Sequence, residues 1–122
     1  MPENYSHRVL ENYRNPKNSG KLDNATHTAE ELNPLCGDEI RVYLKIKDSK
    51  IENMSYEVRG CALSIASASL LSERIIGQNF REIGKIGKSD IEKLLGAKIG
   101  NARKECITLA LNAIKKAVAE QS

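Results

Sequence analysis

Three cysteines stand out in this sequence, because a deprotonated thiol can both bind a metal ion and attack a sulfur–sulfur bond. They are Cys36, Cys61 and Cys106, and Asp38 follows the first of them by two residues. An odd number of cysteines, in a chain that shows no apolar signal segment, favours free thiols over a framework of disulfides. The chemistry to consider is therefore that of thiols as metal ligands or as acceptors of sulfur.

The first two cysteines flank the clearest pair of predicted strands. Cys36 lies in the turn sequence 33–38, directly before a strand predicted over 39–47, and Cys61 follows the end of a second strand. If the two strands pair as an antiparallel hairpin, the start of one lies beside the end of the other. Cys106 falls on the apolar stripe of the last predicted helix, one to two turns inside it, and that stripe must face the sheet or another helix. All three thiols could converge.

The predicted surroundings of two thiols favour the thiolate form. Cys61 precedes a helix N-terminus, whose positive dipole end stabilises an anion, and Cys106 has Arg103 and Lys104 beside it in the sequence. A lone cysteine on an apolar helical face is more often a small buried hydrophobe. No two cysteines have the close spacing of a metal-binding pair, so both interpretations of Cys106 stay open.

Three thiolates would leave one coordination position for another ligand. Asp38 can reach the same ion across the turn at Gly37, or it can simply end that turn, and the sequence favours neither. Glu105 is a weaker alternative, because neighbouring residues on a helix point about 100° apart. His7, in a predicted helix, and His27, in a polar loop, are expected to be exposed and not to bind metal.

Period-two alternation predicts the strands that must hold these residues. Strands are predicted over 39–47 and 54–60, joined by a turn at 48–50, and residues 29–33 could form a further short strand. Between the first helix and that strand, residues 17–28 have the composition of a loop.

Helical spacing and end signals predict the remaining elements. An N-terminal helix is predicted over 6–13, and an Ala- and Ser-rich helix, able to pack closely on the sheet, over 62–76. Two capping-box spacings predict two shorter helices, and Asn101 is expected to cap a long final helix. The two capping-box pairs are Asn79 with Glu82 and Ser89 with Glu92.

Length and composition bound the fold and the partners. The chain has 122 residues, of which 40% are hydrophobic and 29% charged, so a single domain over 1–122 is expected. The element order predicts an α+β fold, with a small antiparallel sheet of about three strands and helices mainly on one face. The net charge of +3 is mild and no apolar run approaches a membrane span, so neither nucleic acid nor a membrane is expected as a partner. We expect a cytoplasmic protein.

Four segments resemble the U-type iron–sulfur cluster scaffold family, which comprises IscU, SufU and the N-terminal domain of NifU. They follow the family's order and are residues 9–10 with 15–20, residues 33–38 (Asn-Pro-Leu-Cys-Gly-Asp), residues 60–69 (Gly-Cys-Ala-Leu-Ser-Ile-Ala-Ser-Ala-Ser) and residues 103–106. The resemblance implies a SufE/NifU-like fold. It also implies a scaffold that receives persulfide sulfur from a cysteine desulfurase, takes up iron, builds a transient 2Fe-2S cluster and transfers it to acceptor apo-proteins. Cys36, Asp38, Cys61 and Cys106 match the positions at which the family binds metal or cluster.

The sequence also departs from both main branches of that family. IscU-type members have a histidine directly before the third cysteine and a chaperone-binding stretch ahead of it, where this chain has Glu105 and residues 98–103. A dedicated Hsp70-type chaperone partner is therefore not expected. SufU-type members resemble this chain in Arg103 and in lacking the histidine, but carry an insertion between the second and third cysteines that is absent here. Arg103 and Glu105 are expected beside the ligands.

Three functions are compatible with these residues. The leading hypothesis is a non-enzymatic scaffold, in which three thiolates and Asp38 hold a transient 2Fe-2S cluster or iron, with Cys36 and Cys106 as candidate acceptors of persulfide sulfur. The first alternative is a SufU-type sulfurtransferase, in which zinc occupies the same four positions. The second is a structural zinc module that only recruits a partner.

Overall fold

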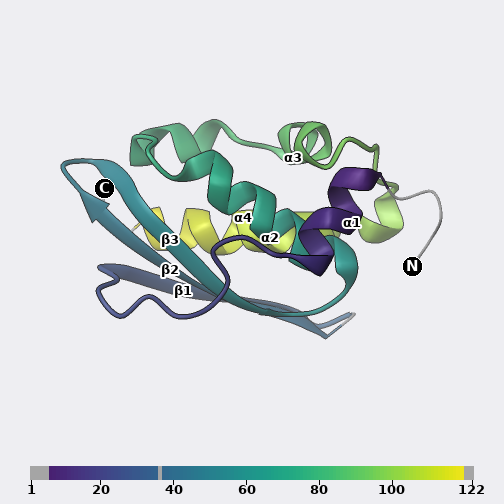
Figure 1. Cartoon of the computed structure of the whole chain (residues 1–122), viewed down its shortest axis with the longest axis horizontal. Helices are drawn as coiled ribbons and strands as arrows, with labels where there is room; N and C mark the ends of the chain where they lie inside the picture. The colour runs from purple at the N-terminus through teal and green to yellow at the C-terminus, as the bar shows by residue number, and fades with distance from the viewer. Residues whose placement is uncertain (1–5, 36, 120–122) are drawn as a thin grey trace.

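A three-stranded antiparallel sheet in the order β1-β2-β3 forms one layer of the structure (Figure 1). The strands are β1 (His27–Asn33), β2 (Asp38–Lys47) and β3 (Lys50–Arg59). The structure is a computed structural model and describes residues 6–35 and 37–119. Each strand pairs with the next along the chain, so the sheet is built from two consecutive hairpins. This confirms the predicted sheet.

Two strands begin two or more residues earlier than predicted, and the start of β2 and the end of β3 each differ by one residue. β1 begins two residues early, so that His27 is a half-buried strand residue and not part of an exposed loop. β3 begins at Lys50, not at 54, because the sheet contains a bulge: Lys45 pairs with Asn53 and Ile46 with Ile51, leaving Glu52 as the extra residue. A bulge breaks the period-two alternation, and the prediction depended on that alternation.

Four α-helices and two short 3-10 helices complete the described chain. The α-helices are α1 (His7–Arg14), α2 (Ala62–Ile75), α3 (Lys88–Leu95) and α4 (Lys104–Ala119). The 3-10 helices are η1 (Phe80–Lys85) and η2 (Asn101–Arg103). Among the described residues no helix combines the length and the apolar character that crossing a membrane requires.

The helices pack on one face of the sheet, as predicted (Figure 1). α2 lies against β3, α4 lies against β1 and β2, and the two helices also contact each other. α1 packs on α2, and α3 contacts both α2 and α4. The core lies between the sheet and these two central helices, and its fully buried large side chains include Leu44, Ile51, Tyr56, Leu63, Leu71, Ile107 and Ile114. The opposite sheet face carries exposed cross-strand ion pairs such as Arg41 with Glu30.

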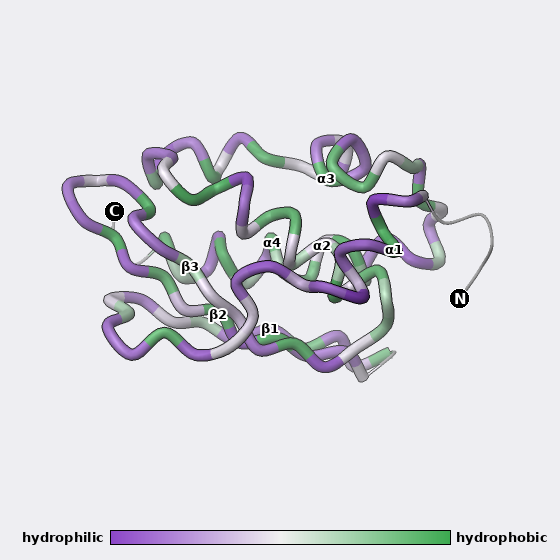
Figure 2. The backbone as a smooth tube through the Cα atoms, in the orientation of Figure 1, coloured by the Kyte–Doolittle hydropathy of each residue, from purple (hydrophilic) through white to green (hydrophobic). Residues whose placement is uncertain are grey.

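Buried serines of α2 hold the polar segment that links α1 to β1 and appears mostly hydrophilic in Figure 2. The backbone N–H of Lys17 donates to Ser69 Oγ (2.8 Å), and Asn18 Nδ2 donates to Ser72 Oγ (2.9 Å). Tyr56 of β3 donates its hydroxyl hydrogen to the Lys17 carbonyl (2.6 Å). These contacts satisfy polar groups that would otherwise be buried without partners.

Several helix ends differ from the predicted caps. Ser6 caps α1 as predicted, accepting from the N–H of Val9. Asn79 Oδ1 accepts from Arg81 N, but the element that it caps is the 3-10 helix η1. α3 is capped by Asp90, whose carboxylate accepts from the Gly87 N–H (2.9 Å), and not by Ser89 with Glu92. The Glu92 carboxylate accepts instead from Ile99 N (2.7 Å).

Candidate metal centre

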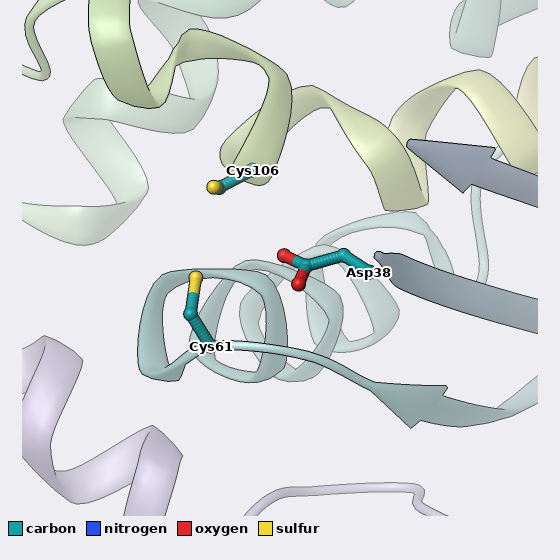
Figure 3. Close-up of side chains that lie close together, drawn as sticks. All are labelled: Asp38, Cys61 and Cys106. Carbon is teal, nitrogen blue, oxygen red and sulfur yellow. The ribbon is translucent and has the colours of Figure 1, made fainter. Parts of the chain in front are cut away.

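Asp38, Cys61 and Cys106 meet at one end of the sheet although they come from three different elements (Figure 3). Asp38 is the first residue of β2, Cys61 is the N-cap residue of α2, and Cys106 is the third residue of α4. One carboxylate oxygen and the two sulfur atoms all lie within 4.8 Å of one another. Cys36 falls outside the described residues, so the structure places three of the four predicted ligands.

Cys61 stands at the positive end of the α2 dipole. Its backbone is extended (φ −75°, ψ 171°) and its carbonyl accepts from the N–H of Ile65, while its side chain makes no capping hydrogen bond. The half-buried Sγ atom contacts Ser64 Oγ (3.5 Å) and lies where the helix end stabilises negative charge.

Cys106 lies in the first turn of α4, where the prediction placed it one to two turns inside the helix. The reason is that residues 101–103 form η2, so Asn101 starts a 3-10 helix and α4 begins at Lys104. Cys106 is half-buried, whereas its neighbour Ile107 is completely buried in the core. Its sulfur lies within 4.8 Å of the Cys61 sulfur and of a carboxylate oxygen of Asp38, which favours the ligand interpretation over the core interpretation.

Asp38 is a buried carboxylate that points into the same space (Figure 3). Its side chain is 5% exposed, and Oδ2 accepts a hydrogen bond of 2.5 Å from Ser64 Oγ. The hairpin before it closes through the pair Asn33 and Asp38, and Gly37 adopts a left-handed conformation (φ +76°) that favours glycine. Asp38 therefore both begins the strand after that turn and presents its carboxylate to the thiols.

Ser64 is a residue of this centre that the sequence interpretation missed. It lies one helical turn after Cys61, so both side chains face the same side of α2. Its hydroxyl contacts Asp38 and is 3.2 Å from the carbonyl oxygen of Cys106. In the sequence, Ser64 is marked only by its spacing of three residues from the cysteine that caps α2. Because α2 contains several other serines, this spacing did not single it out.

Glu105, the alternative oxygen ligand, does not join the cluster of ligand atoms. Glu105 is exposed on α4. Arg103 is an exposed residue that ends η2. Among the described histidine, cysteine and acidic side chains, the group that could share one ion is Asp38, Cys61 and Cys106. The weaker alternative, in which Glu105 supplies the oxygen ligand, is not supported by this geometry.

This donor set suits zinc, iron and iron–sulfur clusters. Thiolate sulfur is the ligand that these metals prefer, and a carboxylate is a harder ligand that exchanges more easily. A closed tetrahedral zinc site has four ligands. The three described groups therefore fit such a metal and leave one position for a further ligand.

The chain is similar to a known protein family and to individual proteins of that family. The family model of the NifU-like N terminal domain matches residues 4–122. Iron-sulfur cluster assembly scaffold protein IscU 1 of Archaeoglobus fulgidus is 33% identical over 116 residues, which cover 95% of this chain and 75% of that protein. Zinc-dependent sulfurtransferase SufU of Bacillus subtilis is 31% identical over 134 residues, covering 96% and 90%. That alignment is longer than the 122 residues of this chain, so SufU has residues that this chain lacks.

Solved structures share the fold. A putative iron-sulfur cluster assembly scaffold protein for the SUF system of Fervidobacterium islandicum superposes with a TM-score of 0.81. The two chains are 27% identical, and the match covers 93% of this chain and 96% of the other. The expected fold, a small antiparallel sheet with helices on one face, is therefore confirmed both by its own architecture and by this likeness.

Proposed function

Because the chain belongs to the family of the NifU-like N-terminal domain, we propose that it is a scaffold for iron–sulfur cluster assembly. The observation that carries the proposal is the meeting of two thiols and one carboxylate within 4.8 Å at one end of the sheet. The cluster is cargo in this proposal. It is built on the chain and then passed to an acceptor apo-protein.

The proposed ligands are Cys61, Cys106, Asp38 and, from the sequence, Cys36. Cys61 is the N-cap residue of α2 and Cys106 lies in the first turn of α4. The N-terminal ends of these helices stabilise negative charge on thiolates and on a bound anionic cluster. Asp38 supplies the position that exchanges most easily, because carboxylate oxygen binds these soft metals less tightly than sulfur does. An exchangeable position suits a protein that must release what it holds.

Sulfur would arrive as a persulfide carried by a cysteine desulfurase. A thiolate of this chain attacks the outer sulfur of the desulfurase persulfide, the sulfur–sulfur bond breaks, and the desulfurase cysteine leaves as a thiolate. The persulfide then resides on this chain without any net oxidation or reduction. We propose Cys36 and Cys106 as the acceptors. We expect the protein to act in the cytoplasm, as one domain over 1–122. The reducing conditions there keep such thiols reduced.

A zinc-dependent sulfurtransferase is the second candidate function. Two thiols and a carboxylate also suit zinc, and the relative from Bacillus subtilis is named as an enzyme of that kind. In that case zinc occupies the centre, and one cysteine leaves the metal to accept sulfur. Both functions share the acceptor step, and they differ in what the centre holds.

Metal and sulfide analysis separates the two functions. The protein is purified with and without air, then incubated anaerobically with Fe²⁺, cysteine, a cysteine desulfurase and a thiol reductant. A scaffold acquires iron and acid-labile sulfide in equal amounts, together with visible cluster absorbance, and a Cys61→Ala variant does not. Zinc that stays bound while no sulfide accumulates would exclude the scaffold function and support the sulfurtransferase. A protein without persulfide on any cysteine would indicate the structural zinc module.

A further inference from the structure

The hydroxyl group of Ser64 contacts all three residues of the metal centre. Its oxygen is 2.5 Å from Oδ2 of Asp38, 3.2 Å from the carbonyl oxygen of Cys106 and 3.5 Å from Sγ of Cys61. The side chain is 2% exposed, so water has little access to it. One buried hydroxyl therefore links β2, α2 and α4 at the point where each of them presents a ligand.

That hydroxyl has a single hydrogen to donate, and the geometry assigns it to Asp38. The contact with Oδ2 is the shortest of the three, and hydrogen bonds to an ionised acceptor are shorter and stronger than bonds to neutral ones. Within residues 6–35 and 37–119, Ser64 is the side-chain donor to this carboxylate. Ser64 thus engages one oxygen of Asp38 and leaves the other, Oδ1, for a different partner.

Among the described residues no cationic side chain pairs with the buried Asp38 carboxylate, and its donor Ser64 is neutral. Burying an ionised group is costly unless it is paired with an opposite charge or coordinates a metal. Ser64 provides a hydrogen bond and no charge, so a cation bound by Cys61 and Cys106 would supply what Asp38 lacks. The hydrogen bond also limits rotation of the carboxyl group, which keeps one oxygen directed at the two sulfurs.

We propose that Ser64 is a positioning residue for the metal centre, which acts by holding the Asp38 carboxylate in its ligating orientation. The proposal rests on the proposed function, since it assumes that the centre binds metal. Partners that hydrogen-bond to metal ligands change metal affinity about 10–100-fold when they are removed. Ser64→Ala is expected to weaken metal binding to that extent.

The test is a titration with Co²⁺ alone, followed by the visible absorption of thiolate-bound cobalt. Wild type, Ser64→Ala and the matched control Ser67→Ala are compared under anaerobic conditions. Ser67 lies one turn further along α2 and is completely buried, and its hydroxyl has no hydrogen-bond partner in the part of the chain that the structure describes. Ser67→Ala should therefore bind Co²⁺ as wild type does, whereas Ser64→Ala should bind it about 10–100-fold more weakly. Ser64→Thr, which keeps the hydroxyl, should recover most of the affinity.

A double-mutant cycle shows whether Ser64 acts through Asp38. In the Asp38→Ala background, Ser64→Ala should cause no further loss of Co²⁺ affinity, because the carboxylate that it holds is gone. An equal loss in both backgrounds would overturn the positioning role. Ser64→Gly removes the same hydroxyl and replaces Ser64→Ala in the cycle if that variant does not fold.

The outcomes separate this inference from the function on which it rests. A wild-type protein that binds neither Co²⁺ nor a cluster would overturn the proposed function. If wild type binds Co²⁺ tightly, and Ser64→Ala binds Co²⁺ with the same affinity as wild type or as Ser67→Ala, only the role of Ser64 is overturned.

Discussion

A Cβ atom on Gly60 would lie 2.7 Å from Cγ of Asp38 and 3.0 Å from each of its carboxylate oxygens. Gly60 joins the end of β3 to Cys61, the cap of α2. The missing side chain at this position therefore makes room for the carboxylate beside the thiols. The glycine is needed here for close packing and not for a left-handed backbone, since Gly60 is not among the residues with positive φ.

Gly60→Ala should displace the Asp38 carboxylate from the centre. The added methyl group cannot fit at 2.7 Å, so the aspartate side chain or the β3–α2 link must move. We expect weaker Co²⁺ binding and a loss of about 1–3 kcal/mol in the free energy of unfolding, the range for overpacking a close contact. Gly84→Ala is the matched control, because a Cβ at Gly84 meets no atom of the described residues within 4 Å. Equal behaviour of the two variants in cobalt titration and urea unfolding would contradict the steric role of position 60.

Asp38→Ala should make a bound 2Fe-2S cluster persist longer while slowing its transfer. The substitution removes an exchangeable ligand and a buried negative charge beside an anionic cluster. For a bare divalent cation the same loss of charge lowers affinity, so Co²⁺ binding and cluster lifetime should change in opposite directions. Cys61→Ala should abolish cluster retention, because a thiolate bond is lost. The measurements are the decay of cluster absorbance in air and the rate of transfer to an apo-ferredoxin. Equally fast loss from both variants would identify Asp38 as a structural ligand.

Persulfide should appear first on Cys36 or Cys106 after incubation with a cysteine desulfurase and cysteine. Cys106 is half-buried, and its thiol lies at the start of α4, where the helix end stabilises a thiolate. Trypsin digestion and mass spectrometry, after alkylation without reductant, locate the added sulfur. Label confined to Cys61 would refute the assignment of the acceptors, and label on no cysteine would contradict sulfur delivery to this chain.

Leu35→Asp should slow sulfur transfer from the desulfurase by about tenfold, the effect of losing a modest interface contact. Leu35 is 92% exposed in the connection between β1 and β2, next to the proposed acceptor Cys36. An exposed leucine beside the reacting thiol is expected to dock on an apolar surface of the partner. Leu32→Asp is the matched control, because Leu32 is also exposed (57%) but belongs to β1. Equal slowing by both substitutions would argue against a specific contact at Leu35.

Stability should fall as the pH rises from about 10 toward 12, in part because of Tyr56. Burial raises the pKa of Tyr56 from 10.0 to about 12, so the folded state favours the protonated phenol. A raised pKa contributes stability that is fully present below pH 10 and is lost as the pH approaches 12. Urea unfolding of wild type and Tyr56→Phe between pH 8 and 11 measures this contribution. The phenylalanine variant should lose less stability over that range, and identical slopes would contradict the assignment.

Patterns of residue types along the sequence were sufficient to predict the sheet. They also predicted which end of the sheet carries the metal centre. Alternating Ile, Val and Leu in residues 39–47 define one buried face of β2, and antiparallel pairing then places its start beside the end of β3. That reasoning predicted Cys36 beside Cys61, and Cys36 lies outside the described residues. Asp38, whose role the sequence left open, is the residue of that turn that the structure places near Cys61. The resemblance of four short segments indicated the family, because those segments follow one another in the family's order through most of the chain.

Tertiary structure decided the features that depend on contacts between distant elements. The bulge at Glu52 moves the start of β3 away from the position that strand alternation predicts. The 3-10 helix η2 before α4 places Cys106 in the first turn of α4. Neither feature can be recognised from residue types nearby in the sequence. The role of Ser64 was hidden for a related reason. Its partners lie 26 and 42 positions away, and a serine in a helix does not reveal whether its hydroxyl meets water, its own backbone or a buried carboxylate. Only the packing of β2, α2 and α4 decides which of these occurs.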